Sequence, residues 1–200
     1  YTDDYLNEEV FERIADTCYI PANRMLLELL KAYPDFSVSF SISGLAIEQM
    51  EYYKPELIES FKELVATGRV ELIAEPYAHS LSSLFDPVEF RSQVRMQQAK
   101  LRELFGVERS RALCNTELIY SDEIASEIAS MGYEGIITEG AKHVLGWKSP
   151  NYLYEAVSAP KTKLLLRNAQ LSELVTNHFS DYGSPEYPVT ADKLLGRVKW

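Results

Sequence analysis

The residue of this sequence that is best placed for chemistry is Glu117, a carboxylate that follows a short apolar run. The run from Ala112 to Cys114 predicts a strand, and Ser121 predicts the start of a helix. A carboxylate between the two is held by rigid backbone and stays within reach of a ligand, as at the strand ends where barrels of alternating strands and helices carry their chemistry. Glu117 is then a nucleophile, or it flanks the helix N-terminus, where a negative charge is favourable. Spacing alone leaves both interpretations open.

Further polar side chains lie at or near the ends of other predicted strands. They are Ser41, Ser43, Glu71, Glu75, His79, Asn115, Glu139, Arg167 and Asn168. Because parallel strands end on one rim, we expect these side chains to line a pocket for a polar substrate. Glu71 lies inside an otherwise apolar strand, so it is a site residue or the ion-pair partner of Arg69 or Arg111. His79 is a site residue or an ordinary surface or packing histidine.

Strands and helices alternate along the chain. Asp86 caps the longest helix, Pro87 occupies its first turn and Glu89 completes a pattern like a capping box, with Gly106 at the end. Strands are expected at 36–42, 69–74, 112–114, 135–138 and 164–167, with 171–179 as one more, and helices at 7–18, 21–33, 45–53, 54–67, 87–105, 121–131 and 190–198. This alternation predicts a parallel sheet with helical crossovers in one domain, residues 1–200. It fits a barrel cut short better than a complete small sandwich.

Composition narrows the possible partners. The formal net charge is −10, which argues against a nucleic acid or an anionic membrane surface as a main partner. The chain has no apolar run of the roughly 18 residues needed to span a bilayer, and no signal peptide is visible, so a cytoplasmic protein is expected. Cys18 and Cys114 form no motif and suit small buried hydrophobes in a reducing compartment. The 13 Tyr, 8 Phe and 2 Trp are a mild indication of a surface that stacks on sugars.

Motifs for other chemistries are absent from the sequence. It has no His-x-x-x-His, His-Glu-x-x-His, Cys-x-x-Cys or Asp-x-Asp pattern, so no metal is expected. It has no Gly-x-Ser-x-Gly elbow, phosphate loop or dinucleotide fingerprint, so no cofactor is expected either. Carboxylate chemistry remains, and glycoside hydrolysis is the main reaction that two carboxylates carry out.

Several segments together resemble the α-amylase-type branch of glycoside hydrolase family 57. They are residues 3–13, 18–24, 68–80, 115–121, 145–152, 167–168 and 188–193. The resemblance implies an incomplete (β/α)₇ barrel and retaining hydrolysis or transfer of α-glucans. It also implies that Glu117, in the family's third conserved motif, is the nucleophile, and that Glu71 and His79 line the substrate site.

The sequence departs from the family pattern in three places. The His-Gln-Pro motif of the first strand is absent and should lie just before Tyr1, and the Asp that serves as general acid/base should lie on a strand beyond Trp200. Leu171-Ser-Glu-Leu stands where many relatives have a Ser-Asp-Asp run. We therefore expect a fragment that holds one of two catalytic carboxylates and is inactive alone.

The expected mechanism is a double displacement. Glu117 attacks the anomeric carbon of an α-glucan or maltooligosaccharide, and water or another sugar then resolves the glycosyl-enzyme. Asn115 hydrogen-bonds the nucleophile or a sugar hydroxyl, and Tyr77, Tyr120 and Trp147 are candidates for stacking on pyranose rings. Two alternatives stay open. One is a metal-dependent polysaccharide deacetylase of similar barrel type, which needs an Asp and paired His ligands, and the other is a non-catalytic carbohydrate-binding fragment.

Overall fold

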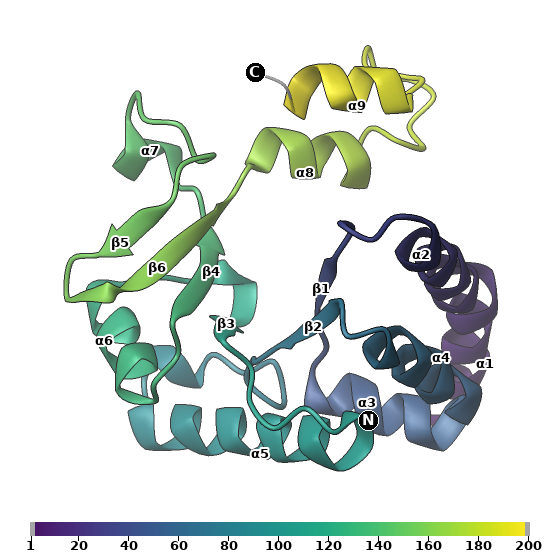
Figure 1. Ribbon diagram of the computed structural model, residues 1–200, viewed down its shortest axis with the longest axis horizontal. Coiled ribbons are helices and arrows are strands. Elements are labelled where there is room, and N and C mark those ends of the chain that lie inside the picture. The colour runs from purple at the N-terminus through teal and green to yellow at the C-terminus, as the bar shows by residue number, and fades with distance from the viewer. Residues whose placement is uncertain (1–2, 199–200) are drawn as a thin grey trace.

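Five parallel strands form the frame of the chain, which a computed structural model describes for residues 3–198 (Figure 1). β1 pairs with β2, and β3, β4 and β6 pair side by side. These strands are β1 (Val38–Ser41), β2 (Val70–Ile73), β3 (Ala112–Cys114), β4 (Gly135–Glu139) and β6 (Ala159–Arg167). A parallel bridge between Ala74 and Leu113 joins the two sets, since the Cys114 amide donates to the Ala74 carbonyl at 2.8 Å. The predicted α/β fold with parallel strands is confirmed, whereas closure into a barrel stays a prediction.

Helices precede, connect and follow the strands. They are α1 (Asp4–Ile14), α2 (Ile20–Ala32), α3 (Gly44–Tyr53), α4 (Pro55–Ala66), α5 (Pro87–Phe105), α6 (Asp122–Ser130), α7 (Lys142–Leu145), α8 (Ala169–Thr176) and α9 (Ala191–Val198). The predicted ends of α5 are confirmed, because the Asp86 carboxylate accepts from the Val88 and Glu89 amides and Gly106 takes φ 68° at the C-terminal cap. Within residues 3–198, no helix is long and apolar enough to cross a membrane.

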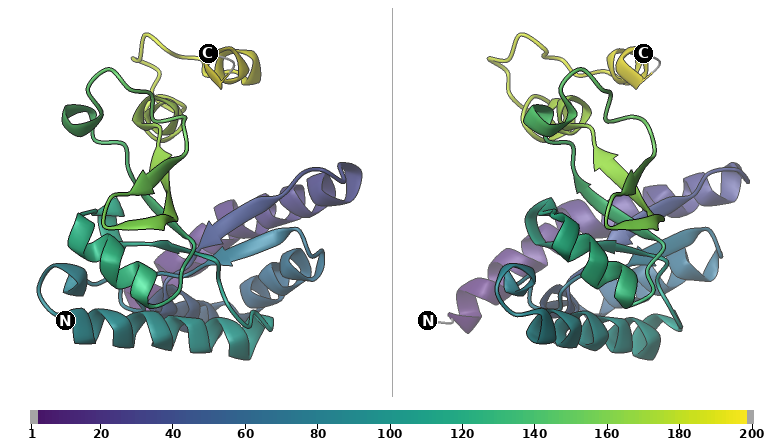
Figure 2. Two further views of the ribbon diagram at one scale, coloured as in Figure 1. Left: turned by 60° about the vertical axis from the view of Figure 1, so that its left-hand side comes forward. Right: turned by 90° about the vertical axis from the view of Figure 1, so that its left-hand side faces the viewer.

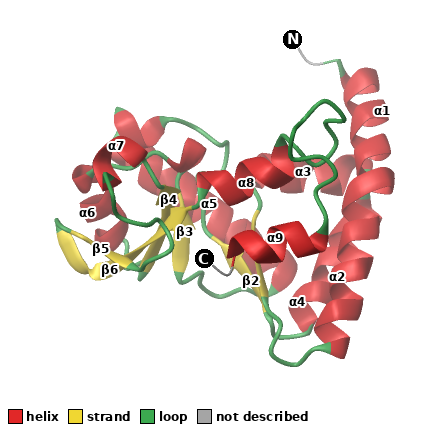
Figure 3. Cartoon of the chain, turned by 90° about the horizontal axis from the view of Figure 1, so that it is seen from above, coloured by secondary structure: helices red, strands yellow, loops and turns green. Residues whose placement is uncertain are grey.

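The N-terminal helices differ from the prediction of two separate helices. The helix begins at Asp4, capped by Asp3, and continues through a π-helical turn, η1 (Ala15–Tyr19), into α2. Figure 3 shows α1 and α2 as one long rod along one side of the chain. Pro21 has no amide hydrogen to bond the carbonyl four residues earlier, and the wider π turn just before it accommodates that loss without ending the helix.

The segment after β4 also departs from expectation. Residues 171–179 were expected to form a strand, but residues 171–176 belong to helix α8, because the Asn168 side chain accepts from the Leu171 amide and caps the helix. The stretch 150–157, for which no strand was predicted, contains β5 (Tyr154–Ala156). β5 pairs antiparallel with β6 and forms the edge of the sheet.

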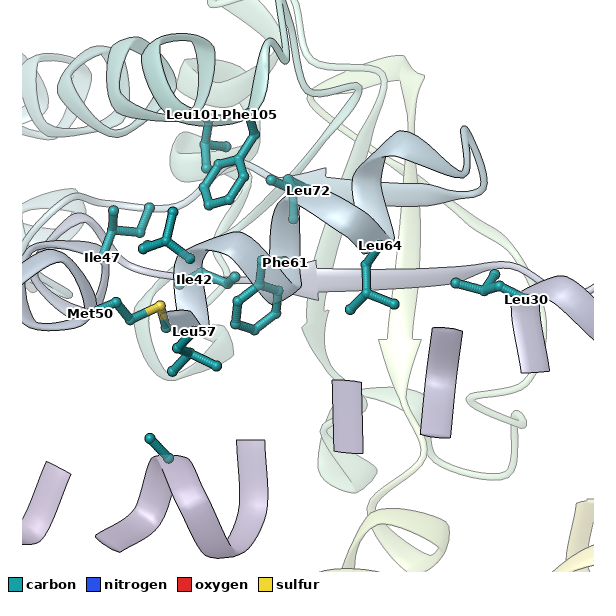
Figure 4. Packing of buried hydrophobic residues seen from close by; sticks show 12 residues of the cluster. Leu30, Ile42, Ile47, Met50, Leu57, Phe61, Leu64, Leu72, Leu101 and Phe105 are labelled. Carbon is teal, nitrogen blue, oxygen red and sulfur yellow. The ribbon is translucent and has the colours of Figure 1, made fainter. Parts of the chain in front are cut away.

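Two apolar clusters hold these elements together. The first joins α2, α3 and α4 to β1, β2 and the end of α5, and Figure 4 shows its members, which include Leu30, Ile47, Leu57, Leu64, Leu72, Leu101 and Phe105. The second joins the start of α5 to β3, α6, β4 and β6, and it includes Phe90, Val94, Leu113, Ile128, Ile136 and Leu164. α5 contributes to both clusters and runs beneath the strands in both views of Figure 2. It therefore fixes the first two strands relative to the rest of the sheet.

Candidate active site

Glu117 lies in a tight turn directly after β3. The turn is a 3₁₀ segment, η3 (Thr116–Leu118), closed by a hydrogen bond of 2.9 Å from the Leu118 amide to the Asn115 carbonyl. Glu117 and Leu118 have φ values of 53° and 56°, a left-handed backbone that side-chain-bearing residues rarely adopt. The Glu117 side chain is 73% exposed. Helix α6 is capped by Ser121, which accepts from the Ile124 amide, so the cap is not Glu117.

The loop after β2 brings His79 to Glu117. Nε2 of His79 lies 3.4 Å from Oε1 of Glu117, and both side chains are exposed. His79 also has a left-handed backbone, with φ 51°. Among residues 3–198, the non-glycine residues with positive φ are His79, Glu117 and Leu118, so the strained backbone of this part of the chain gathers at one place. Strain of this kind persists where surrounding contacts enforce it and is typical of functional sites.

Asn115 supplies such a contact. It is 1% exposed, and its side-chain amide donates to Oγ of Ser83 at 3.0 Å and to the carbonyl of Ile119 at 2.9 Å. These bonds tie the loop after β2 to the turn that carries Glu117. Oδ1 of Asn115 and Oγ1 of Thr116 are buried without a hydrogen-bond partner among the described residues. Asn115 therefore supports the backbone of the site from beneath it.

Glu75 is a further acidic residue at this edge of the sheet. It was predicted to lie on the rim of the pocket, with no individual role. It is 7% exposed, and Oγ of Ser41, at the end of β1, donates to its Oε2. Burial raises the pKa of the Glu75 carboxyl, while the Ser41 hydrogen bond and the positive charge of His79 lower it. Burial, and then the charge of Glu75, raise the pKa of the Cys114 thiol at the end of β3. The ends of β1, β2 and β3 thus meet around one carboxyl group.

The two candidate tyrosines, Tyr77 and Tyr120, each hydrogen-bond a neighbouring carboxylate through the ring hydroxyl. The Tyr77 hydroxyl donates to Glu48, and burial followed by that bond raises the pKa of Tyr77 to about 12. Its ring covers Gly44, where an added Cβ would lie 2.1 Å from Cδ2 of the ring. Tyr120 donates to Oδ1 of Asp122 at 3.1 Å, and burial followed by that contact raises the pKa of Tyr120 to about 12.

Glu71 and Trp147 lie apart from the Glu117–His79 contact. Glu71 is exposed in β2, opposite Ser39 of β1. Neither predicted ion pair forms, because Arg69 donates to the carbonyls of Leu30 and Tyr33 and Arg111 pairs with Glu134 at 2.7 Å. Trp147 follows α7 and is 93% exposed. Within residues 3–198, no three His, Cys, Asp or Glu side chains lie together as metal ligands would.

A cleft opens where β4 and β6 end. Its volume is about 630 Å³, and it is lined by Gly140, Lys142, Leu145, Gly146, Lys148, Ser149, Pro150, Asn151, Asn168, Ala169, Gln170 and Arg197. Asn168 donates to Oδ1 of Asn151 at 2.9 Å, and next to the cleft Arg167 pairs with Glu139 at 2.9 Å. A side chain at Gly140 would place a Cβ 2.5 Å from the Arg167 carbonyl oxygen. The glycine therefore allows β4 and β6 to approach at the mouth of the cleft.

Comparison with known proteins identifies the family. A model described as "Glycosyl hydrolase family 57" matches residues 1–200. The chain belongs to this family. A Methanocaldococcus jannaschii protein named "Putative alpha-amylase" is 45% identical over 194 residues, which are 96% of this chain but 41% of that protein. The chain thus spans less than half of the length of this relative.

Two solved structures share the fold. The 4-alpha-glucanotransferase of Thermococcus litoralis superimposes with a TM-score of 0.69 and 18% identity over 85% of this chain and 27% of that one. A Mycobacterium smegmatis protein described as a "putative polysaccharide deacetylase" gives a TM-score of 0.64 and 19% identity over 90% of this chain and 59% of that one. These identities show likeness of fold alone. At the Glu117–His79 contact, an imidazole N–H can bond one carboxylate oxygen and leave the other oxygen free.

Proposed function

We propose that the full-length protein is a retaining glycoside hydrolase or glucanotransferase that acts on α-glucans, with Glu117 as its nucleophile. The observation that carries the proposal is the Glu117 carboxylate, which projects from a strained turn at a strand end with His79 Nε2 at 3.4 Å. Membership of family 57 supports glycoside chemistry. Relatives named as alpha-amylases and 4-alpha-glucanotransferases support α-glucans as the substrate class.

The proposed reaction has two steps. In the first, one oxygen of Glu117 bonds the anomeric carbon as the glycosidic C–O bond breaks, and a second carboxyl gives its proton to the departing oxygen. In the second, water or a sugar hydroxyl gives its proton back to that carboxyl and displaces Glu117, so the anomeric configuration is retained. The two carboxyls need to lie about 5–5.5 Å apart. We propose that the acid/base Asp lies beyond Trp200, as the resemblance to the family implies, so turnover is tested in the full-length protein.

The remaining candidate residues take supporting roles in this proposal. His79 donates to Oε1 of Glu117 and directs the other oxygen to the sugar, and Asn115 holds the turn on which Glu117 sits. Trp147 offers the most exposed of the candidate rings for stacking. Glu71, Tyr77 and Tyr120 are proposed to line the substrate site. Because Tyr77 and Tyr120 each donate to a carboxylate, they would present ring edges of fixed orientation.

Replacement of Glu117 tests the proposal. In the full-length protein, Glu117→Gln should lower kcat on maltooligosaccharides on the order of 10³-fold or more, because the amide cannot form the glycosyl ester. A fluorinated maltooligosyl fluoride should label the unmodified protein at Glu117, as seen by peptide mass spectrometry. Glu117→Ala supplied with azide and an α-glycosyl fluoride should yield the β-glycosyl azide. The control is Glu155→Gln, an exposed carboxylate that pairs with Lys163 on the edge strand.

Three outcomes would overturn the assignment. Near-normal turnover by Glu117→Gln would remove the nucleophile. Loss of activity on chelation, together with release of acetate from acetylated glycans, would favour the deacetylase that shares this fold. Maltooligosaccharide binding by calorimetry without any turnover in the full-length protein would favour a non-catalytic carbohydrate-binding role.

A further inference from the structure

Another cavity, here called the arginine cavity, lies at the opposite end of β3 from Glu117. Its volume is about 520 Å³, and its walls come from α5, the turn before β3, the end of α6 and the turn before β4. β3 and β4 run parallel and both begin beside these walls, whereas Glu117 follows the end of β3. The arginine cavity is therefore separate from the candidate active site.

Three guanidinium groups line the arginine cavity, against one carboxylate. Arg102 pairs with that carboxylate, Glu108, at 3.2 Å. Arg109 is held by neutral acceptors instead, since its Nη2 donates to backbone carbonyls, that of Gly132 at 2.5 Å. Arg95 is exposed and has no hydrogen bond or ion pair to any residue between 3 and 198. In a chain of net charge −10, the arginine cavity thus carries a net positive charge.

The wall of the arginine cavity also contains a buried phenol without a protein partner. Tyr133 is 8% exposed, and its hydroxyl has no hydrogen-bond partner in the described part of the chain, residues 3–198. Burial raises the pKa of Tyr133, and the positive charge of Arg109 lowers it. Buried polar groups normally have a partner, because the hydrogen bond lost to water is costly. Phenylalanine would fill the same space, so the hydroxyl is explained by an acceptor that enters the cavity.

We propose that the arginine cavity binds a small phosphate monoester. Guanidinium groups keep their charge and bond phosphate oxygens in pairs. The Tyr133 hydroxyl donates to a further oxygen, and Val94 and Met131 form an apolar wall for the organic part of the ligand. The cavity has room for both parts, since small-molecule sites commonly measure about 300–1,000 Å³. This inference goes beyond the proposed function and does not depend on the role of Glu117.

Calorimetry on the full-length protein, with inorganic phosphate and phenyl phosphate as probes, tests the inference. Phenyl phosphate should bind about 10-fold more tightly than inorganic phosphate or better, because its ring is buried against the apolar wall, and phenol should not bind. Arg95→Gln should weaken binding of both phosphates about 10-fold, as loss of a charge-assisted hydrogen bond does, with Tm unchanged. Tyr133→Phe should weaken binding about 5-fold and leave Tm equal or higher, because no internal hydrogen bond is lost.

Two control variants locate the bound phosphate. Arg24→Gln removes an exposed arginine of α2 that pairs with no other residue of the described chain, 3–198, and it should leave the affinity unchanged. Lys148→Gln removes a cation from the cleft over β4 and β6 and should also leave it unchanged. Equal losses in these variants and in Arg95→Gln would indicate a non-specific effect of charge. That result, an unchanged affinity in Arg95→Gln, or no binding by the unmodified protein would each overturn the inference.

The methionines give a second readout of where the ligand lies. Met131 lines the arginine cavity, whereas Met25, Met50 and Met96 do not. In the full-length protein with ¹³C-methyl methionine, the Met131 signal is assigned by its loss in Met131→Leu. Phenyl phosphate should shift this signal and leave those of the other three unchanged. Binding without a shift at Met131 would overturn the inference. If Glu117→Gln keeps its turnover, the proposed function fails and this inference stands.

Discussion

The sheet edge divides into two regions of different charge. The region over β1, β2 and β3, here called the acidic rim, carries the buried Glu75 and the exposed Glu117, which contacts His79. The cleft over β4 and β6 is lined by Lys142, Lys148 and Arg197, and its lining residues within 3–198 include no carboxylate. In a chain of net charge −10 such a cleft stands out. One edge thus carries carboxylates in one region and mainly basic and amide side chains in the other, where Arg197 is paired with Glu186 at 2.9 Å.

The two regions also differ in backbone. In the acidic rim, non-glycine residues adopt left-handed conformations, and the buried amide of Asn115 holds the turn. In the cleft, these positions are glycines. Gly140 lies close to the Arg167 backbone and Gly146 has a positive φ, and glycine adopts such geometry without strain. Strain is therefore concentrated where we place bond making and breaking. The region that offers only contacts is free of it, which is the pattern expected when strain is part of a mechanism.

The largest difference between the regions is expected for their asparagines. Asn115→Ala removes two buried hydrogen bonds and should cost about 2–3 kcal/mol of unfolding free energy, with kcat in the full-length protein falling about 10²-fold as the Glu117 turn relaxes. Asn151→Ala, which removes one exposed bond in the cleft, should cost less than about 1 kcal/mol and leave kcat unchanged. Denaturant unfolding and steady-state kinetics measure both. Equal effects would show that the acidic rim is no more preorganised than the cleft.

A smaller effect is expected for glycine at the cleft. Gly140→Ala forces a Cβ to 2.5 Å from a backbone oxygen and should cost about 1–3 kcal/mol, with KM raised and kcat kept. The control variant, Gly196→Ala, is expected to change stability in the opposite direction. Gly196 lies inside α9 with no atom within 4 Å of an added Cβ, so Gly196→Ala should gain about 0.5–1 kcal/mol through helix propensity. A change in kcat with Gly140→Ala would mean that the cleft is not separate from the chemistry.

The two regions were not equally predictable from sequence. Alternation of strands and helices predicted the parallel sheet, and Asp86 with Gly106 marked α5 correctly, because capping is a local property. The prediction of a strand over 171–179 failed. A short apolar run fits either a strand or a helix, and the cap at Asn168 favours the helix. It also failed at Pro21, since sequence rules end a helix at proline and do not foresee a π turn.

The acidic rim shows why the site was only partly predicted. Register along parallel strands placed Glu75 and Glu117 at one edge. The Glu117–His79 contact, however, depends on left-handed backbone at residues that are not glycine, which tertiary contacts impose and the local sequence does not signal. Glu75 was predicted on the rim, but its burial was not predicted, because a carboxylate at a strand end has the same sequence pattern whether it is buried or exposed. Its position directly before Pro76, after three apolar residues, was the one available signal.

The smallest expected effect is on stability, when one carboxylate from each region is replaced. For Glu75 in the acidic rim, this effect depends on pH. Burial raises the pKa of Glu75 in the folded chain above its ordinary value of 4.5, so the protonated form is favoured by folding. That stability is present below the unfolded pKa and is lost as pH rises through the folded one. Glu75→Gln should therefore be slightly more stable than the unmodified protein at neutral pH, and the gain should vanish at pH values below 4.5. Thermal unfolding at several pH values measures it.

The partner of this comparison is Glu139→Gln, which breaks the half-exposed pair with Arg167 beside the cleft. It should lose up to about 1 kcal/mol at neutral pH, the opposite sign to Glu75→Gln, because a paired carboxylate is removed and not a buried, uncompensated one. High salt should shrink the Glu139 effect and leave the Glu75 effect in place, since exposed pairs are screened and buried groups are not. If both variants lose stability, Glu75 is an ordinary structural carboxylate and the acidic rim bears no cost of function.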